Sequence, residues 1–188
     1  MIQKDYLKKS DQLYDLIEKT HDKKIDLWLG NVVFTWRWWL GVALTVLPWM
    51  LWIFLRTKES THRILYAGFF SMFISSWFDY IGVALGLWHY NYDVVPMVPS
   101  YLPWDFALIP ITIMFMIQFK PHFNPYIKSL IFAGGSAFIG EPIFKMLNTY
   151  DPEQWKYIYS FLILFVICLI AQIITKREEY NKLQDNFK

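Results

Sequence analysis

The chain has 188 residues, of which 55% are hydrophobic, 20% are aromatic and only 18% are charged. Average soluble domains carry about 25% charged residues, and the mean hydropathy here is +0.25. This composition excludes an ordinary soluble enzyme, a disordered tail and a secreted disulfide scaffold. The net charge of +2 indicates no nucleic-acid partner, and the single cysteine, Cys168, has no partner for an internal disulfide. The composition predicts a membrane protein.

Residues 1–31 are expected to form an amphipathic helix outside the membrane. They hold six lysines and six acidic residues, with Tyr6, Leu13 and Ile17 at helical spacing. They contain no apolar run of the length that a signal peptide needs. Such a helix lies against the membrane surface, or else it contacts a protein partner or a second copy of the chain. Both alternatives remain open at this point.

Five apolar stretches follow, and each approaches the roughly 20 residues that cross a hydrocarbon core about 30 Å thick. They are Val33–Leu55, Ile64–Trp88, Pro103–Phe119, Tyr126–Leu147 and Trp155–Thr175. Trp and Tyr residues gather near their ends, as in the aromatic belt at headgroup level. The sequence therefore predicts an all-α, polytopic transmembrane helix bundle with about five spans over residues 32–176, followed by a polar tail at 177–188.

Prolines within three of these spans are expected to kink the helices. Pro48, Pro110 and Pro142 each remove a backbone N–H from a helix interior.

Four ionisable residues fall within or beside the spans, namely Arg37, Asp79, Asp105 and Glu141. A charge at membrane depth costs at least about 2.5 kcal/mol, so each of these residues needs a reason to be there. Because successive spans run in opposite directions, all four are expected in the same half of the bilayer.

Small residues accompany two of the acids. One stripe carries Asp79, Gly82 and Gly86, and a second carries Ala133, Ala137 and Glu141. Small residues let helix backbones approach, so both acids are expected to face the interior of the bundle. The aromatic loop at 89–102 lies at the same end, which predicts an acidic pocket with aromatic walls.

The residues expected to contact a ligand in this pocket are Asp79, Asp105, Glu141, Trp88, Tyr90 and Arg37. Each also has a structural interpretation. Asp105 suits the first turn of a helix, and Asp79 and Glu141 can fix helix register. Arg37 can extend to the headgroups. No metal site and no cofactor is expected, because the histidines are not grouped with these acids and no HExxH, P-loop or similar motif occurs.

Three functions are compatible with this pattern. The favoured one is binding or permeation of a cation, an amine or a lipid-like ligand, because carboxylates and aromatic faces both attract positive charge. The second is an intramembrane enzyme in which Asp79 or Glu141 is a general acid for a lipid or isoprenoid. The third is a structural or signalling membrane protein. Membrane lipids are expected partners in every case, and nucleic acid in none.

A resemblance extends this reading over about residues 33–165. Its motifs are Asp79-Tyr80-Ile81-Gly82, Gly86-Leu87-Trp88-His89-Tyr90, Phe138-Ile139-Gly140-Glu141-Pro142 and Trp155-Lys156-Tyr157. In combination they resemble a family of small five-helix integral membrane proteins, of unknown function, from endospore-forming Gram-positive bacteria. The resemblance implies a multi-pass protein of the plasma membrane. It also implies that Asp79, Trp88, Tyr90, Asp105, Glu141 and Pro142 belong to a family signature.

A fainter likeness covers residues 77–110, which are similar to the membrane-bound bacterial lycopene cyclase domain. That likeness implies an intramembrane carboxylic acid that protonates an isoprenoid. The chain departs from the cyclase pattern in two places. Leu102-Pro103-Trp104-Asp105-Phe106 offers one acid where the cyclase has two glutamates, and Ile109-Pro110 replaces a pair of aromatic residues.

Overall fold

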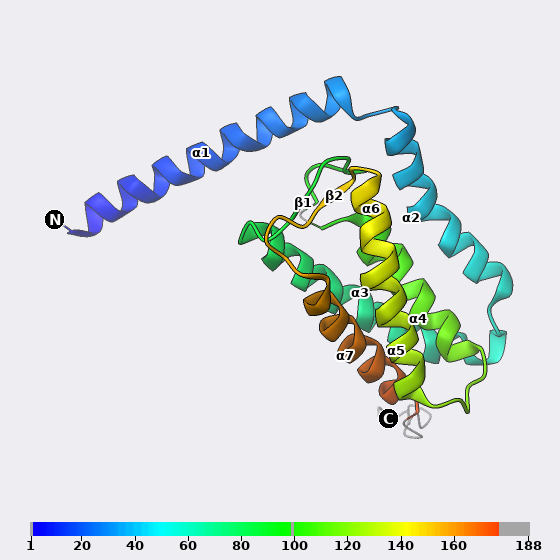
Figure 1. The fold of residues 1–188 in the computed structure, drawn as a ribbon. Helices are drawn as coiled ribbons and strands as arrows, with labels where there is room; N and C mark the ends of the chain where they lie inside the picture. Colours follow the sequence, from blue (N-terminus) through cyan, green and yellow to red (C-terminus); the bar gives the residue numbers. More distant parts are fainter. Residues whose placement is uncertain (1, 99, 177–188) are drawn as a thin grey trace, which may run out of the picture.

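The computed structural model describes residues 2–98 and 100–176, so the expected polar tail at 177–188 lies outside the described residues. The helices are α1 (Ile2–Asn31), α2 (Trp36–Leu55), η1 (Lys58–Ser60), α3 (Thr61–Ala84), η2 (Pro103–Leu108), α4 (Ile109–Gln118), α5 (Pro125–Gly135), η3 (Ser136–Gly140), α6 (Glu141–Met146) and α7 (Tyr157–Thr175). Two short strands, β1 (His89–Tyr90) and β2 (Tyr150–Asp151), pair antiparallel at one end of the bundle (Figure 1). The expected all-α bundle is confirmed.

Within residues 2–98 and 100–176, four helical segments are long and apolar enough to cross a membrane: Trp36–Leu55, Lys58–Ala84, Pro125–Met146 and Tyr157–Thr175. The remaining expected span is shorter. Its helix, Pro103–Gln118, combines six residues of η2 with ten of α4, which gives about 24 Å against a hydrocarbon core of about 30 Å.

The short helix α4 is instead the most enclosed part of the bundle. Ile109, Ile113 and Met114 are at most 2% exposed, because α3, α5 and α7 surround this segment (Figure 1). The small side chains Ala133 and Ala171 are fully buried where α5 packs on α7. The helices around α4 therefore shield it from lipid.

Two of the three prolines mark a local change of helix type. Pro110 and Pro142 each lie just after a π-helical segment, η2 and η3 respectively. Pro110 has no N–H for the carbonyl of Phe106, four residues earlier. The Trp49 indole of α2 donates to that carbonyl at 2.8 Å, so a side chain from a neighbouring helix replaces the missing backbone donor.

The expected second span is wrong at its end. It was drawn to Trp88, but α3 stops at Ala84 and Gly86 then adopts a left-handed φ of +67°. The chain folds back so that the Trp88 ring lies on Gly82, where an added Cβ would be 1.9 Å from the ring. Gly82 therefore leaves room for the Trp88 indole, and Gly86 allows the chain to turn back. The expected contact of a neighbouring helix with Gly82 and Gly86 is wrong.

Candidate functional site

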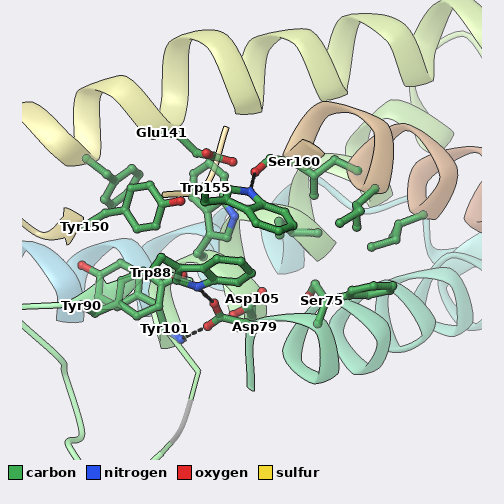
Figure 2. Close-up of a pocket in the computed structure, with 17 residues that line it drawn as sticks. Ser75, Asp79, Trp88, Tyr90, Tyr101, Asp105, Glu141, Tyr150, Trp155 and Ser160 are labelled. Atoms are coloured by element: carbon green, nitrogen blue, oxygen red, sulfur yellow. Dashed lines mark hydrogen bonds between the residues drawn. The ribbon is translucent and has the colours of Figure 1, made fainter. Parts of the chain in front are cut away.

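A cavity of about 80 Å³ lies between α3, η2, α6 and α7, at the end of the bundle that carries β1 and β2 (Figure 2). Three acids line it: Asp79, Asp105 and Glu141. Eight aromatic residues complete most of its wall: Phe78, Trp88, Tyr90, Tyr101, Trp104, Phe144, Tyr150 and Trp155. Four separate helical segments contribute to it, so the cavity forms only when the bundle is assembled.

The Asp79 carboxylate is occupied by hydrogen bonds from the loop that follows α3. Its Oδ1 accepts from the Trp88 indole at 2.6 Å and from the Tyr90 hydroxyl at 2.7 Å, and its Oδ2 accepts from the Tyr101 backbone N–H at 2.8 Å. Asp79 is only 5% exposed. A buried carboxylate needs such donors, and these three also fix both ends of the loop over the cavity.

Asp105 lies beside this cluster and is 1% exposed. The Asp79 and Ser75 side chains lie near its carboxyl group. Its Oδ2, however, has no hydrogen-bond partner among the described residues.

Glu141 approaches the cavity from the opposite side, at the start of α6. The side chains of Ser160 and Tyr150 lie near its carboxyl group. Its Oε2 is buried and unpartnered among the described residues. In the view of Figure 2, the rings of Trp88 and Trp155 lie between Glu141 and the two aspartates. The centroids of these rings are 4.7 Å apart in an edge-to-face arrangement.

The tyrosines at the loop end of the cavity are held in their neutral form. Burial raises the pKa of Tyr90 well above its ordinary value, and the Asp79 and Asp105 charges raise it further. Burial likewise raises the pKa of Tyr101 and of Tyr150. Each hydroxyl therefore keeps its proton at neutral pH, and that of Tyr90 remains a donor to Asp79.

Arg37 does not line the cavity, so its expected place among the ligand contacts is corrected. Its guanidinium donates to the Leu147 carbonyl at 3.0 Å and to the Tyr92 hydroxyl at 3.1 Å, and it stacks on the rings of Trp36 and Tyr92. Arg37 instead joins α2 to the end of α6 and to the loop.

The structure brings together the other five residues expected from the sequence: Asp79, Asp105, Glu141, Trp88 and Tyr90. The cavity also includes residues that were not expected there. Ser75 lies one helical turn before Asp79 on the same face, a spacing that the sequence displays. Tyr150 and Trp155 were expected in the aromatic belt, and both belong with Ser160 to the segments that carry the family resemblance, but nothing in their spacing indicated the cavity.

A second group of possible metal ligands lies on the strands outside the cavity. Ligand atoms of His89, Asp151 and Glu153 all lie within 4.8 Å of one another, and His89 Nδ1 pairs with Glu153 Oε1 at 3.2 Å. The sequence did not indicate this grouping, because the antiparallel pairing of β1 with β2 creates it. His89 and Glu153 are exposed, and their ion pair accounts for the arrangement without an ion.

No known protein family, curated protein or solved structure matches this chain significantly.

Proposed function

We propose that this membrane protein binds a small cation, or the amine group of a small ligand, in the acidic cavity. The observation that carries the proposal is the pair of buried carboxyl oxygens without partners, Asp105 Oδ2 and Glu141 Oε2, in one aromatic-walled cavity. Buried polar atoms are nearly always hydrogen-bonded. Two such oxygens in the same cavity are the atoms that a positively charged group could contact.

The chemistry of the wall favours a positively charged group. A carboxylate in low dielectric attracts a cation strongly, and the faces of Trp and Tyr rings add cation–π attraction. Asp79 contributes negative charge, but its oxygens already accept hydrogen bonds from Trp88, Tyr90 and Tyr101. Asp105 and Glu141 are therefore the proposed ligand-contacting acids.

The size of the cavity limits the ligand. A volume of about 80 Å³ is far below the 300–1,000 Å³ that drug-sized ligands occupy. It admits a metal cation or an ammonium group with a short chain, while the ring of a carotenoid is too large. This observation supports binding of a small cation over the carotenoid cyclisation that the fainter likeness implies.

The test measures thermal stabilisation of the purified protein in detergent by three probes: potassium chloride, ethanolamine and choline. A ligand that binds only the folded state raises the unfolding temperature. We expect at least one probe to stabilise the wild type, and Asp105→Asn and Glu141→Gln to abolish that effect. Glu59→Gln, which changes an exposed acid in η1, is the matched control and should respond as the wild type does.

Two outcomes contradict the proposal. One is a wild type that no probe stabilises and from which native mass spectrometry detects no bound cation or amine. The other is stabilisation that both cavity variants retain in full.

A catalytic role is a second candidate, and the proximity of the Asp79 and Asp105 carboxyl groups favours it. A buried carboxylic acid with an unpartnered oxygen can donate a proton to a lipid or isoprenoid. Comparison of membrane lipid extracts from cells that carry wild type or Asp105→Asn separates the candidates. A lipid species that accumulates only with the variant indicates catalysis, while identical extracts indicate binding.

The family resemblance extends this proposal to a cellular location. If the chain belongs to the five-helix family that its motifs resemble, it lies in the plasma membrane of an endospore-forming bacterium. The apolar helical segments support a membrane location in general.

A further inference from the structure

The long helix α1 has two chemically distinct halves. At 100° per residue, all six acids of the helix fall on one half of its circumference, together with four of its six lysines. The opposite half, here called the apolar half of α1, holds most of the large apolar residues, among them Tyr6, Leu13, Tyr14, Leu16, Ile17, Leu27 and Trp28, whereas Leu7, Ile25 and Leu29 fall on the charged half. Its only charged residues are Lys9 and Lys24.

The apolar half of α1 faces the membrane domain where the two meet. The Trp28 indole donates to the Asp93 carbonyl at 2.8 Å, and the Lys24 ammonium pairs with the Asp93 carboxylate at 2.8 Å. The neighbouring carbonyl of Val94 accepts from Trp38 in the first turn of α2, at 3.1 Å. One loop therefore contacts both the end of α1 and the point where α2 enters the apolar part of the bundle.

Beyond this contact the apolar half of α1 is uncovered. Tyr6 is 67% exposed, Leu13 61% and Ile17 51%. The helix has 30 residues and is about 45 Å long, and Figure 1 shows that it leaves the bundle sideways, from the end that carries β1 and β2. Most of the helix thus extends past the bundle, at the same end of the bundle as the first turn of α2. The apolar half that contacts Asp93 runs along this extension.

We infer that α1 lies on the surface of the membrane that the bundle crosses, with its apolar half in the headgroup region. Trp28 and the tryptophans in the first turn of α2 mark the level of the headgroup region, because Trp residues favour the membrane interface. An amphipathic helix at this depth buries its apolar residues about 5–10 Å into the boundary of headgroups and acyl chains.

The charge distribution fits a lipid surface. No acid lies on the apolar half of α1, so none meets the lipid phosphates, and Lys9 can pair with a phosphate while its stem stays in the apolar layer. A second copy of the helix fits less well. A coiled-coil seam is a narrow stripe, whereas these apolar residues spread over about half of the circumference. The inference does not depend on what the cavity binds.

Spin labels on the full-length protein test the inference in nanodiscs of phosphatidylcholine and phosphatidylglycerol. The native Cys168 is fully buried and is first replaced by alanine. Labels are then introduced by Leu13→Cys and Ile17→Cys on the apolar half, and by Asp15→Cys and Asp22→Cys on the charged half as matched controls. Collision rates with oxygen, which dissolves in the acyl layer, and with a water-soluble nickel chelate report the depth of each label.

We expect the labels at residues 13 and 17 to collide more with oxygen than with the chelate, and the labels at residues 15 and 22 to show the reverse order. Equal exposure of all four labels to the chelate would overturn the inference and leave α1 in water. Strong dipolar coupling between two copies labelled at residue 13 would also overturn it, by assigning the apolar half to a dimer.

Discussion

Asp79 serves the structure of the site more than its chemistry. Its three hydrogen bonds, from Trp88, Tyr90 and Tyr101, come from the two ends of the loop that follows α3. The carboxylate thus stabilises the turn that brings aromatic rings over the cavity. Among the described residues that line the cavity, the buried carboxyl oxygens without partners belong to Asp105 and Glu141, and this difference separates a positioning acid from two candidate ligand contacts.

Gly82 is the residue on which the position of Trp88 depends. An alanine Cβ there would lie 1.9 Å from the indole, so the ring must move and release Asp79. We expect Gly82→Ala to lower the free energy of unfolding by about 3 kcal/mol, the upper part of the range for overpacking. Thermal or denaturant unfolding in detergent measures the loss.

Gly134→Ala in α5 is the matched control for this substitution. An added Cβ at Gly134 meets no heavy atom within 4 Å, so alanine should raise stability by about 0.5–1 kcal/mol through its better helix propensity. Equal effects of the two substitutions would show that the contact between Gly82 and Trp88 does not control this region.

At the scale of elements, a proline and a tryptophan from different helices act together. Pro110 leaves the Phe106 carbonyl without its usual helical donor, and Trp49 of α2 supplies the N–H. Hydrogen bonds between membrane helices are worth about 0.6 kcal/mol on average and up to about 1.7 kcal/mol. This bond therefore contributes modestly to stability, and it fixes α2 against the buried helix.

We expect Trp49→Phe to destabilise the protein by about 1 kcal/mol, measured by unfolding in detergent. Trp39→Phe, at an exposed position of the same helix, controls for the loss of an indole. A double-mutant cycle with Pro110→Ala isolates the bond. Alanine at position 110 restores a backbone N–H for the Phe106 carbonyl. Trp49→Phe should therefore lower the free energy of unfolding by less in the Pro110→Ala protein than in the wild type. An unchanged cost would mean that Trp49 stabilises by packing alone.

At the scale of the whole molecule, the cap formed by the 89–102 loop and β2 links stability to alkaline pH. Tyr90, Tyr101 and Tyr150 have pKa values raised above their ordinary 10.0, chiefly by burial. Unfolded chains ionise these tyrosines near pH 10, whereas the folded protein keeps them neutral to higher pH. Their neutral packing therefore stabilises the fold fully below pH 10, and this stability is lost as the pH rises above that value.

The unfolding temperature should thus fall steeply above pH 10, together with the appearance of tyrosinate absorbance. The double variant Tyr90→Phe/Tyr150→Phe removes two of these ionisable groups and should show a shallower fall. If the wild type forms all of its tyrosinate near pH 10 without losing stability, these side chains are not buried as described.

Much of this architecture follows from composition and spacing. Continuous apolar runs such as Tyr157–Thr175 satisfy their backbone polar groups only as helices in lipid, so the sequence was enough to predict an all-α bundle. Acids as rare in apolar runs as Asp79, Asp105 and Glu141 must face the interior, because lipid cannot solvate them. Alternating span direction then predicted all three at the same end of the bundle, and they line one cavity.

Only the tertiary structure decided how these acids are used. Gly86 reverses the chain and returns Trp88 to Asp79, and the pairing of β1 with β2 brings Tyr150 to the cavity. The Arg37 guanidinium donates hydrogen bonds to the end of α6 and to Tyr92 of the 89–102 loop, and not to an acid. These outcomes depend on turns, rotamers and contacts between distant segments, whereas periodicity specifies only which face of an element is apolar.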